Sequence, residues 1–253
     1  MGQSAADYAK PAPRRYFILG TGRNGSSLFS AILAASGANF GMTHTGTWDP
    51  RTGAYEHPAL GRGAACYRLS ERLRDASHVS RWVMWRRKWL RAKAKIHLRR
   101  ALHEAEYLKT GDARVPMLAR QLGFTPCILL LFRNYREQFA SAYLRHGSSV
   151  SELRHYYFDV NQSALLALSI YGGTVVHYAD IVDHTRTEWA RTVGEVTGLP
   201  ADRLLEKRVQ LVKPRTPTGT SPLIEDTDLD ALDAQLRSLC GRIFAASRLA
   251  ERT

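Results

Sequence analysis

A short apolar run that ends in a glycine-rich loop most constrains how this chain can fold. Residues 16–19 (YFIL) are too few for a helix and lead directly into GTGRNGSS, after which residues 28–36 carry helix-forming side chains up to Gly37. This order predicts a strand, a tight loop and a helix with Gly37 as its C-cap. The loop also predicts an anion site, because glycines let backbone amides turn toward a charge and a helix N-terminus adds partial positive charge.

The same order of strand and helix recurs twice further along the chain. The apolar run 127–132 (CILLLF) precedes a helical stretch that closes at Gly147, and the run 174–178 (TVVHY) precedes a helical stretch over 188–197 that closes at Gly198. Continuous apolar strands followed by helices are typical of a parallel sheet that is covered on both faces. The sequence therefore predicts a doubly wound α/β fold with a central parallel sheet flanked by helices.

The rest of the chain predicts one domain with two unusual segments. Residues 1–14 are polar and contain proline, so we expect a disordered leader there. Residues 15–253 contain no repeat and no linker, and we expect them to form a single domain. A basic helix candidate over 81–100 and a loop rich in Pro, Thr and Gly over 213–222, expected to be flexible, do not follow the strand and helix order.

The charge of the chain predicts anionic partners. The 36 Lys and Arg residues exceed the 23 Asp and Glu residues, which gives a formal net charge of +13. Such a surplus fits a nucleotide, nucleic acid, an acidic glycan or a membrane surface. Cys66, Cys127 and Cys240 are widely separated and lack CxxC spacing, which argues against a disulfide framework or a zinc site. No apolar stretch has the length of a signal peptide core or a membrane span, so we expect a cytoplasmic protein.

The glycine-rich loop departs from a nucleotide triphosphate loop in one informative way. Gly20 and Gly25 have the GxxxxG spacing of a Walker A loop, but Ser26 stands where the lysine belongs and the cation is Arg23 inside the loop. Kinases and ATPases need a lysine and Mg²⁺ to neutralise the phosphates during transfer. A sulfuryl group carries less charge, so Arg23 and backbone amides would suffice without a metal. A turn without any ligand and a degenerate kinase loop are the alternatives.

A second pair of polar residues follows the second strand. Arg133 ends the apolar run, and Ser141 lies eight positions later on the following helix. The two side chains can converge on one phosphate, through a charge-assisted hydrogen bond and a hydroxyl donor. Considered alone, the pair is better interpreted as a solvated arginine and a packed serine.

Both motifs together resemble the PAPS-dependent sulfotransferase family, in particular its bacterial branch, over residues 16–199. That resemblance implies a P-loop-type fold in which the early loop holds the 5′-phosphosulfate of 3′-phosphoadenosine 5′-phosphosulfate (PAPS). By position, the residues assigned to this loop are Gly22, Arg23, Asn24, Gly25, Ser26 and Ser27. Arg133 and Ser141 would hold the 3′-phosphate that distinguishes PAPS from ATP. Many members have lysine in place of Arg23, and a proline where this chain has Tyr135.

The resemblance also implies where the proton of the acceptor goes. The segment 53–60 (GAYEHPAL) is similar to a Gly-x-x-Glu segment of bacterial members, which makes Glu56 the expected base, with a surface glutamate as the alternative. Partial burial in a cleft would raise the pKa of such a glutamate. The segment 107–112 (YLKTGD) has Gly111 where the cytosolic branch has a histidine, and Lys109 is expected to stabilise the charge that develops in transfer. The reserve candidates for the base are His57, Asp112 and His44.

Two positively charged segments leave their interpretation open. Residues 81–100 hold nine Lys or Arg and no acid, with Trp82, Trp85, Trp89 and Ile96 on one helical face. That face either packs on the core or receives an anionic acceptor or anionic lipid headgroups. In the late loop, Arg215 is expected to approach the 3′-phosphate, unless the loop is an ordinary exposed one.

The sequence thus predicts an enzyme that transfers a sulfuryl group from PAPS to a hydroxyl acceptor, without a metal and with a carboxylate base. The acceptor is expected to be a glycan, a glycolipid or a secondary metabolite, and no nucleic-acid partner is expected. Peripheral contact with the inner membrane face is a further expectation. A P-loop small-molecule kinase and a non-catalytic protein that binds anionic surfaces are the competing hypotheses.

Overall fold

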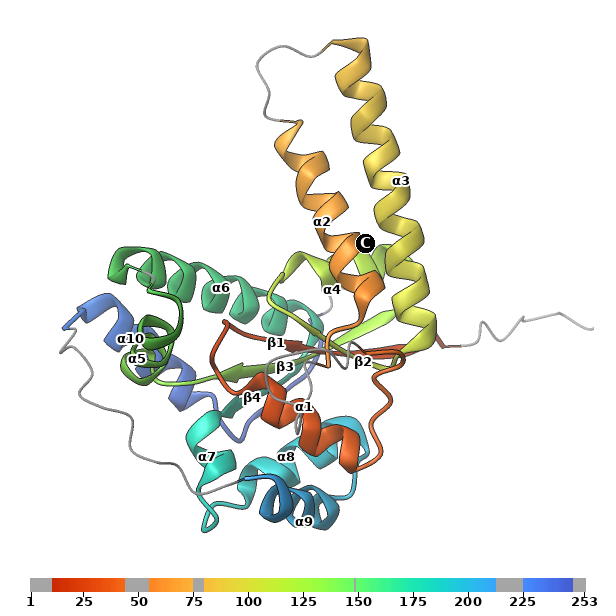
Figure 1. The fold of residues 1–253 in the computed structure, drawn as a ribbon. Helices are drawn as coiled ribbons and strands as arrows, with labels where there is room; N and C mark the ends of the chain where they lie inside the picture. The colour runs from red at the N-terminus through yellow and green to blue at the C-terminus, as the bar shows by residue number, and fades with distance from the viewer. Residues whose placement is uncertain (1–10, 44–54, 75–79, 148, 213–224, 248–253) are drawn as a thin grey trace, which may run out of the picture.

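The computed structural model describes residues 11–43, 55–74, 80–147, 149–212 and 225–247, and within them one sheet is covered by helices on both faces (Figure 1). The strands are β1 (Arg14–Leu19), β2 (Tyr107–Thr110), β3 (Thr125–Phe132), β4 (Gly173–His177) and β5 (Ile243–Phe244). The helices are α1 (Ser26–Ala35), α2 (Pro58–Arg72), α3 (Arg81–Glu104), α4 (Arg114–Gln121), α5 (Tyr135–His146), α6 (Val150–Tyr171), α7 (Tyr178–Val182), α8 (Glu188–Thr197), α9 (Ala201–Leu211) and α10 (Thr227–Ser238).

The sheet has the strand order β2-β1-β3-β4-β5. The predicted parallel, doubly wound sheet is confirmed for β1 to β4, which all run in the same direction. The short β5 pairs antiparallel with β4, so the complete sheet is mixed. β1 begins at Arg14, inside the predicted leader, because Arg14 pairs with Thr125 at the start of β3.

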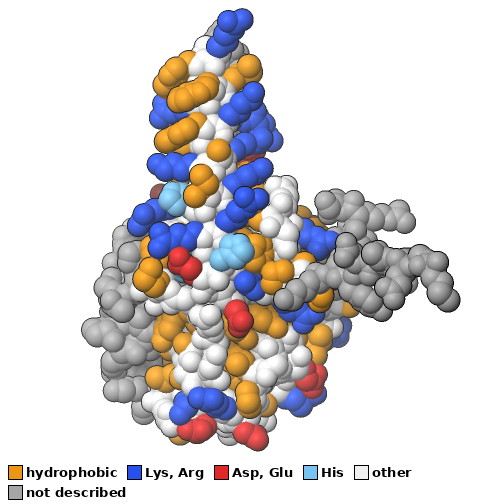
Figure 2. Space-filling model, turned by 90° about the vertical axis from the view of Figure 1, so that its right-hand side faces the viewer, with side chains coloured by type: hydrophobic (Ala, Val, Ile, Leu, Met, Phe, Trp, Pro, Cys, Tyr) orange, Lys and Arg blue, Asp and Glu red, His pale blue; other side chains and the backbone are white. Residues whose placement is uncertain are grey.

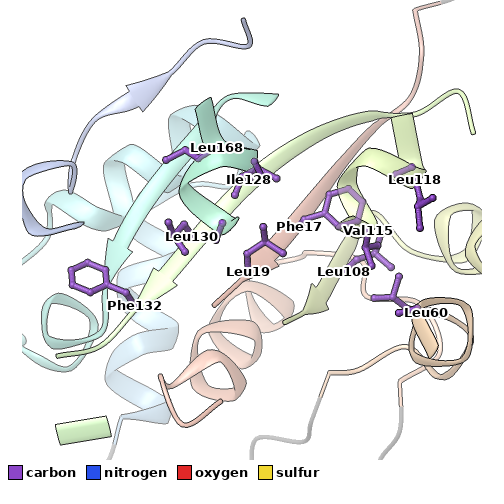
Figure 3. Close-up of a cluster of buried hydrophobic side chains, with 14 of the residues drawn as sticks. Phe17, Leu19, Leu60, Leu108, Val115, Leu118, Ile128, Leu130, Phe132 and Leu168 are labelled. Carbon is purple, nitrogen blue, oxygen red and sulfur yellow. The ribbon is translucent and has the colours of Figure 1, made fainter. Parts of the chain in front are cut away.

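Side chains of the central strands alternate between two separate apolar layers. Phe17 and Leu19 of β1 point into the layer formed with α2, α3, α4, α6 and α10, whereas Ile18 points into the layer formed with α1, α8 and α9. Figure 3 shows the first of these layers, where Ile128 and Leu130 of β3 continue the row. Both faces are therefore buried, as the uninterrupted apolar runs of the sequence predicted.

The strand order places a topological switch point between β1 and β3. The chain leaves β1 toward β2 on one side, and then crosses to β3 and β4 on the other side. In open α/β sheets with this order, ligands bind beyond the carboxyl ends of the strands at the switch point. The two motifs found in the sequence follow β1 and β3, so the topology brings them to the same edge of the sheet.

Helices α2 and α3 form an antiparallel hairpin that projects from the body of the molecule (Figure 1). Helix α3 buries Leu90, Ala94 and Leu98 within the hairpin and at its base. Gly63 of α2 permits close packing, because a Cβ atom there would lie 2.8 Å from Leu98 Cγ. None of the helices in the described residues is long and apolar enough to cross a membrane.

The tryptophan face of α3 does not pack on the core. Trp82, Trp85 and Trp89 are 59%, 63% and 47% exposed, and Ile96 is 67% exposed. The interpretation that this face is covered by the core is therefore wrong. A different face of the same helix, one with smaller apolar side chains, makes the contact with α2.

Candidate active site

A cleft of about 1180 Å³ opens beyond the carboxyl ends of β1, β2 and β3. Its walls come from the glycine-rich loop after β1, the start of α2, the end of β2 with residues 111–114, and one face of α6. Six Lys or Arg side chains line it against three Asp or Glu side chains. A concave surface with this surplus of positive charge attracts an anionic ligand.

The glycine-rich loop is held in place by buried hydrogen bonds from its own polar residues. The Asn24 side chain is fully buried, donates to the Leu131 carbonyl at 2.7 Å and accepts from the Ser26 amide at 3.0 Å. The buried Thr21 hydroxyl donates to Gln138 Oε1 at 2.8 Å. Asn24, which the resemblance assigned to the cofactor, therefore acts on the shape of the loop, since its amide bonds β3 and the first turn of α1.

Gly25 is required by the conformation at the start of α1. It is the N-cap residue with φ of 91°, a left-handed conformation that glycine adopts without steric cost. A Cβ atom at Gly25 would lie 2.1 Å from the ring of Tyr178. No acidic side chain occupies the first turn of α1, where Ser26 and Ser27 lie, so the partial positive charge of the helix N-terminus remains available to an anion.

Unusual backbone geometry marks both sides of the cleft. Among the described residues, Arg23 (φ 68°) and Tyr55 (φ 52°) are the two non-glycine residues with positive φ. Such conformations are uncommon for long or bulky side chains and cluster at functional sites. Arg23 is the loop cation itself, and Tyr55 directly precedes Glu56, the expected base.

The two predicted anion sites form one continuous surface. The Arg23 guanidinium donates to Ser141 Oγ from Nε at 3.3 Å and from Nη2 at 3.1 Å. A residue of the β1 loop therefore touches a residue of α5, 118 positions later in the chain. The spatial condition for a nucleotide that contacts both motifs is met.

Arg133 follows β3 directly, and its side chain is almost completely buried. It donates to Glu137 Oε2 at 3.0 Å and stacks over the ring of Tyr178 at 5.0 Å. The hydroxyl of Tyr157 donates to the Arg133 carbonyl at 3.0 Å, which fixes the backbone at the strand end. Since Glu137 is exposed, a ligand phosphate can share or replace this ion pair without leaving a buried carboxylate unpaired.

Lys109 and Glu56 meet on the opposite wall of the cleft. Lys109 Nζ lies 3.1 Å from Ser27 Oγ, to which it donates, and 3.4 Å from Glu56 Oε1. Burial lowers the pKa of Lys109, and the charge of Glu56 opposes that shift. The Glu56 side chain is 63% exposed, so it can be reached by a ligand that enters the cleft.

His57 and Asp112, two reserve candidates for the base, are committed to other contacts. His57 is buried as the N-cap of α2, where Nδ1 accepts from the Ala59 amide at 3.2 Å and Nε2 lies 2.9 Å from Glu104. Burial tends to raise the pKa of Asp112, but hydrogen bonds and charge from Arg114, with a further hydrogen bond from Arg68, outweigh it and hold that pKa below its usual value.

The remaining two predicted residues, His44 and Arg215, lie outside the described residues. The contact between the loop 213–222 and the cleft therefore stays a prediction. Gly22 and Gly111 lie in the cleft lining, close to the ring hydroxyl of Tyr156.

Helix α6 supplies the part of the cleft that sequence reasoning missed. The Gly22 amide donates to the hydroxyl of Tyr156 at 3.2 Å, and Asp159 and Ser163 line the same wall. No motif marks these positions. A signal for the helix itself was present, because Ser149 and Glu152 form a capping box at its N-terminus.

The cleft also contains arginines that the sequence did not single out. Arg62 and Arg68 come from α2, and Arg114 begins α4. They extend the positive charge from the glycine-rich loop toward the hairpin. The end of the cleft at the hairpin, as well as the end at the glycine-rich loop, is therefore cationic.

No protein-family model matches the chain, and no curated protein matches it significantly. Among solved structures, the sulfotransferase domain of the Synechococcus PCC 7002 olefin synthase superposes with a TM-score of 0.51 at 16% sequence identity, covering 90% of this chain and 96% of that one. A sulfotransferase domain from the curacin biosynthetic pathway gives a TM-score of 0.48 at 11% identity, over 94% of this chain and 100% of that one. The fold is therefore that of a sulfotransferase domain, as the resemblance to the sulfotransferase family implied.

Proposed function

We propose that the protein is a sulfotransferase that moves the sulfuryl group of PAPS to a hydroxyl of an acceptor. The convergence of Arg23, Ser141 and Arg133 in one cationic cleft at the switch point supports this proposal. Lys109 and Glu56 face the same cleft from β2 and the start of the hairpin. The cleft thus has groups for two anionic ends of a nucleotide and, separately, a carboxylate for a proton.

In this proposal the nucleotide changes the partners of two arginines. Arg23 leaves Ser141 Oγ to contact the phosphosulfate, next to the amides at the N-terminus of α1. Ser141 and Arg133 then donate to the 3′-phosphate, where a charge-assisted bond is about twice as strong as a neutral one. Arg23 and Arg133 thus have hydrogen-bond partners both with and without the nucleotide. The protein therefore loses little stability when the nucleotide is not bound.

The transfer step assigns the proton to Glu56. The acceptor oxygen attacks sulfur as the bond from sulfur to the bridging phosphate oxygen breaks, and the carboxylate of Glu56 takes the hydroxyl proton. Lys109 lies 3.4 Å from Glu56 and stabilises negative charge that develops on the transferred group. The products are a sulfate ester and adenosine 3′,5′-bisphosphate.

A ligand-stabilisation experiment tests the nucleotide part of the proposal. Adenosine 3′,5′-bisphosphate should raise the unfolding temperature more than ATP does, and without magnesium, because only the bisphosphate offers a 3′-phosphate to Arg133 and Ser141. Arg133→Ala should remove that preference. A larger shift with ATP and Mg²⁺ would instead indicate a kinase, and no shift with either nucleotide would contradict both enzymes.

A product experiment tests the transfer itself and finds the acceptor. The protein is incubated with PAPS and an extract of glycolipids, glycans and small metabolites, and the mixture is searched by mass spectrometry for species that gain the mass of one SO₃ group. Glu56→Gln should abolish most of the gain while the bisphosphate still stabilises the protein. Retained transfer in Glu56→Gln would move the role of base to another residue, such as Asp159 in the cleft wall.

A further inference from the structure

The outward face of α3 exposes large apolar side chains that a globular surface seldom shows together. Trp82, Trp85, Trp89 and Ile96 all lie on this face, and each is about half exposed or more. The chain has five tryptophans, and these three are more than half of them. Figure 2 shows hydrophobic side chains along the length of the hairpin with Lys and Arg beside them.

Helical geometry separates this face from the one that contacts α2. At 100° per residue, Trp82, Trp85, Trp89 and Ile96 fall within about 60° of one another. Leu90, Ala94 and Leu98, which are buried, lie on the opposite side of the helix. The exposed stripe is therefore a second apolar face, and it is not needed to hold the hairpin together.

Cations border the stripe on both sides. On one side, the Arg86 guanidinium lies 5.0 Å from the ring centroid of Trp82, and Lys93 Nζ lies 4.8 Å from that of Trp89. On the other side the helix exposes further basic side chains, namely Lys88, Lys95 and Arg99. Residues 81–100 contain no acid, so nothing within this segment neutralises the border.

We infer that this face of α3 docks the protein on an anionic lipid bilayer. Tryptophan rings favour the boundary between headgroups and acyl chains, and Lys and Arg beside them are attracted to anionic headgroups. The stripe spans fifteen residues, about 21 Å of helix, which is long enough to lie in the plane of the surface. On an anionic bilayer, the apolar centre of this face would enter the boundary between headgroups and acyl chains. The cations on both borders would remain at the level of the anionic headgroups.

A second copy of the chain fits this face less well than a bilayer. Pairing two α3 faces would set the five cations that border the stripe against the same five of the other copy, and residues 81–100 contain no acid to separate them. Like charges placed together in an interface oppose association. A bilayer with anionic lipids supplies the opposite charge and accepts the tryptophans at the same time.

The docked face leaves the cleft accessible. Among the described residues, the cleft lining includes six from α2, such as Arg62 and Arg68, and none from α3. Helix α2 therefore separates the cleft from the stripe. A protein held by α3 keeps the mouth of the cleft open beside the surface instead of pressed against it.

The test is binding of the whole protein to lipid vesicles. Vesicles of phosphatidylcholine alone are compared with vesicles that contain phosphatidylserine, by co-sedimentation at low and high salt. Binding is expected only with phosphatidylserine and should weaken as salt rises. The triple variant Arg86→Gln, Lys88→Gln, Lys93→Gln should bind about a hundredfold more weakly, and Trp82→Ala, Trp85→Ala, Trp89→Ala at least about tenfold more weakly.

A matched control comes from α9, on the far layer of the molecule. The variant Arg203→Gln, Lys207→Gln, Val209→Ala removes two basic side chains and one exposed apolar side chain, and it should bind vesicles like the unmodified protein. Vesicles with brominated acyl chains should quench tryptophan fluorescence of the unmodified protein, which reports insertion without any substitution.

Several outcomes would overturn the inference. Equal binding to both kinds of vesicle, no binding, or unchanged binding by both α3 variants would do so. A dimer in solution that the tryptophan variant converts to a monomer would assign the face to a second copy. Binding to a soluble acidic polysaccharide in the absence of vesicle binding would assign the face to a glycan. Because the inference does not use the cleft, it stands or fails independently of sulfuryl transfer.

Discussion

The cleft and the outer face of α3 are both rich in cations, but the two regions hold them in opposite ways. In the cleft, Arg23, Lys109 and Arg133 each bond to a hydroxyl or a carboxylate from another part of the chain or the next helical turn. On α3, Arg86 and Lys93 lie over exposed tryptophan rings. The first arrangement fixes each charge in one place, which suits one small ligand. The second spreads charge over a surface, which suits an extended partner.

The largest expected effect follows from the loss of the loop cation. Arg23→Ala should reduce the rate of sulfuryl transfer by about 10²–10³, the usual effect of removing one preorganised donor to a transition state. Vesicle binding should not change, since Arg23 is not on α3. Arg23→Lys keeps the charge and should retain more of the rate. If Arg23→Ala transfers the sulfuryl group at the normal rate, the cations of the cleft are not specialised for catalysis, and the contrast with the cations of α3 is wrong.

A smaller effect, a loss of nucleotide affinity, is expected when the second anion site loses Arg133. Arg133→Ala should weaken binding of adenosine 3′,5′-bisphosphate by roughly 10- to 100-fold, because it removes a charge-assisted hydrogen bond. The affinity for adenosine 5′-monophosphate, which lacks the 3′-phosphate, should hardly change. Calorimetric titration of both nucleotides checks this, and equal losses for both would show that Arg133 does not contact the 3′-phosphate.

Substitution of Gly25, which lines the cleft, and of Gly123, which does not, tests how closely the backbone packs at the cleft. Gly25 and Gly123 have similar φ values of 91° and 88°, but a Cβ at Gly25 would lie 2.1 Å from the Tyr178 ring, whereas a Cβ at Gly123 meets nothing within 4 Å. Both alanine variants should lose about 1–2 kcal/mol from the left-handed conformation, and Gly25→Ala about 1–3 kcal/mol more from overpacking. Chemical denaturation checks the difference, and equal losses would mean that Tyr178 moves freely.

The smallest expected effect concerns acid stability. Since the pKa of Asp112 is lowered in the folded protein, its contribution is present above the unfolded value of 3.8 and is lost as pH falls through the folded value. Asp112→Asn should lower the unfolding temperature at neutral pH by roughly 2–4 °C and flatten its decrease below about pH 4. Asp202→Asn, exposed on α9, is the control and should leave the profile unchanged.

The sequence predicted the elements whose signal is local. The strands at 127–132 and 174–178, the helix over 188–197 and the left-handed glycines at 147 and 198 agree with the structure to within about two residues. The glycine-rich loop and the pair Arg133 and Ser141 were predicted to hold opposite ends of one nucleotide. The structure brings the two motifs into contact through Arg23 and Ser141, because parallel strands end at the same sheet edge.

The rest depended on contacts that are distant in the chain. Helix α3 has two apolar faces, and periodicity alone could not decide whether the tryptophans or Leu90, Ala94 and Leu98 meet α2. The two-residue β5 is too short for any pattern, and Tyr156 enters the cleft from a position on α6 that no motif marks. The orientation of α3, the pairing of β5 and the position of Tyr156 all depend on the element that packs next to each of them in the folded protein.

The placement of the hairpin has a consequence for how such chains diverge. Helices α2 and α3 together form part of the connection from β1 to β2, so the hairpin is an elaboration of one crossover in the sheet. Shortening it by whole turns from its far end would leave the register of Tyr16 with Tyr107 unaltered. Insertions and deletions at the far end of the hairpin can therefore change how far it projects from the body of the molecule. The positions of the residues at the strand ends would stay the same.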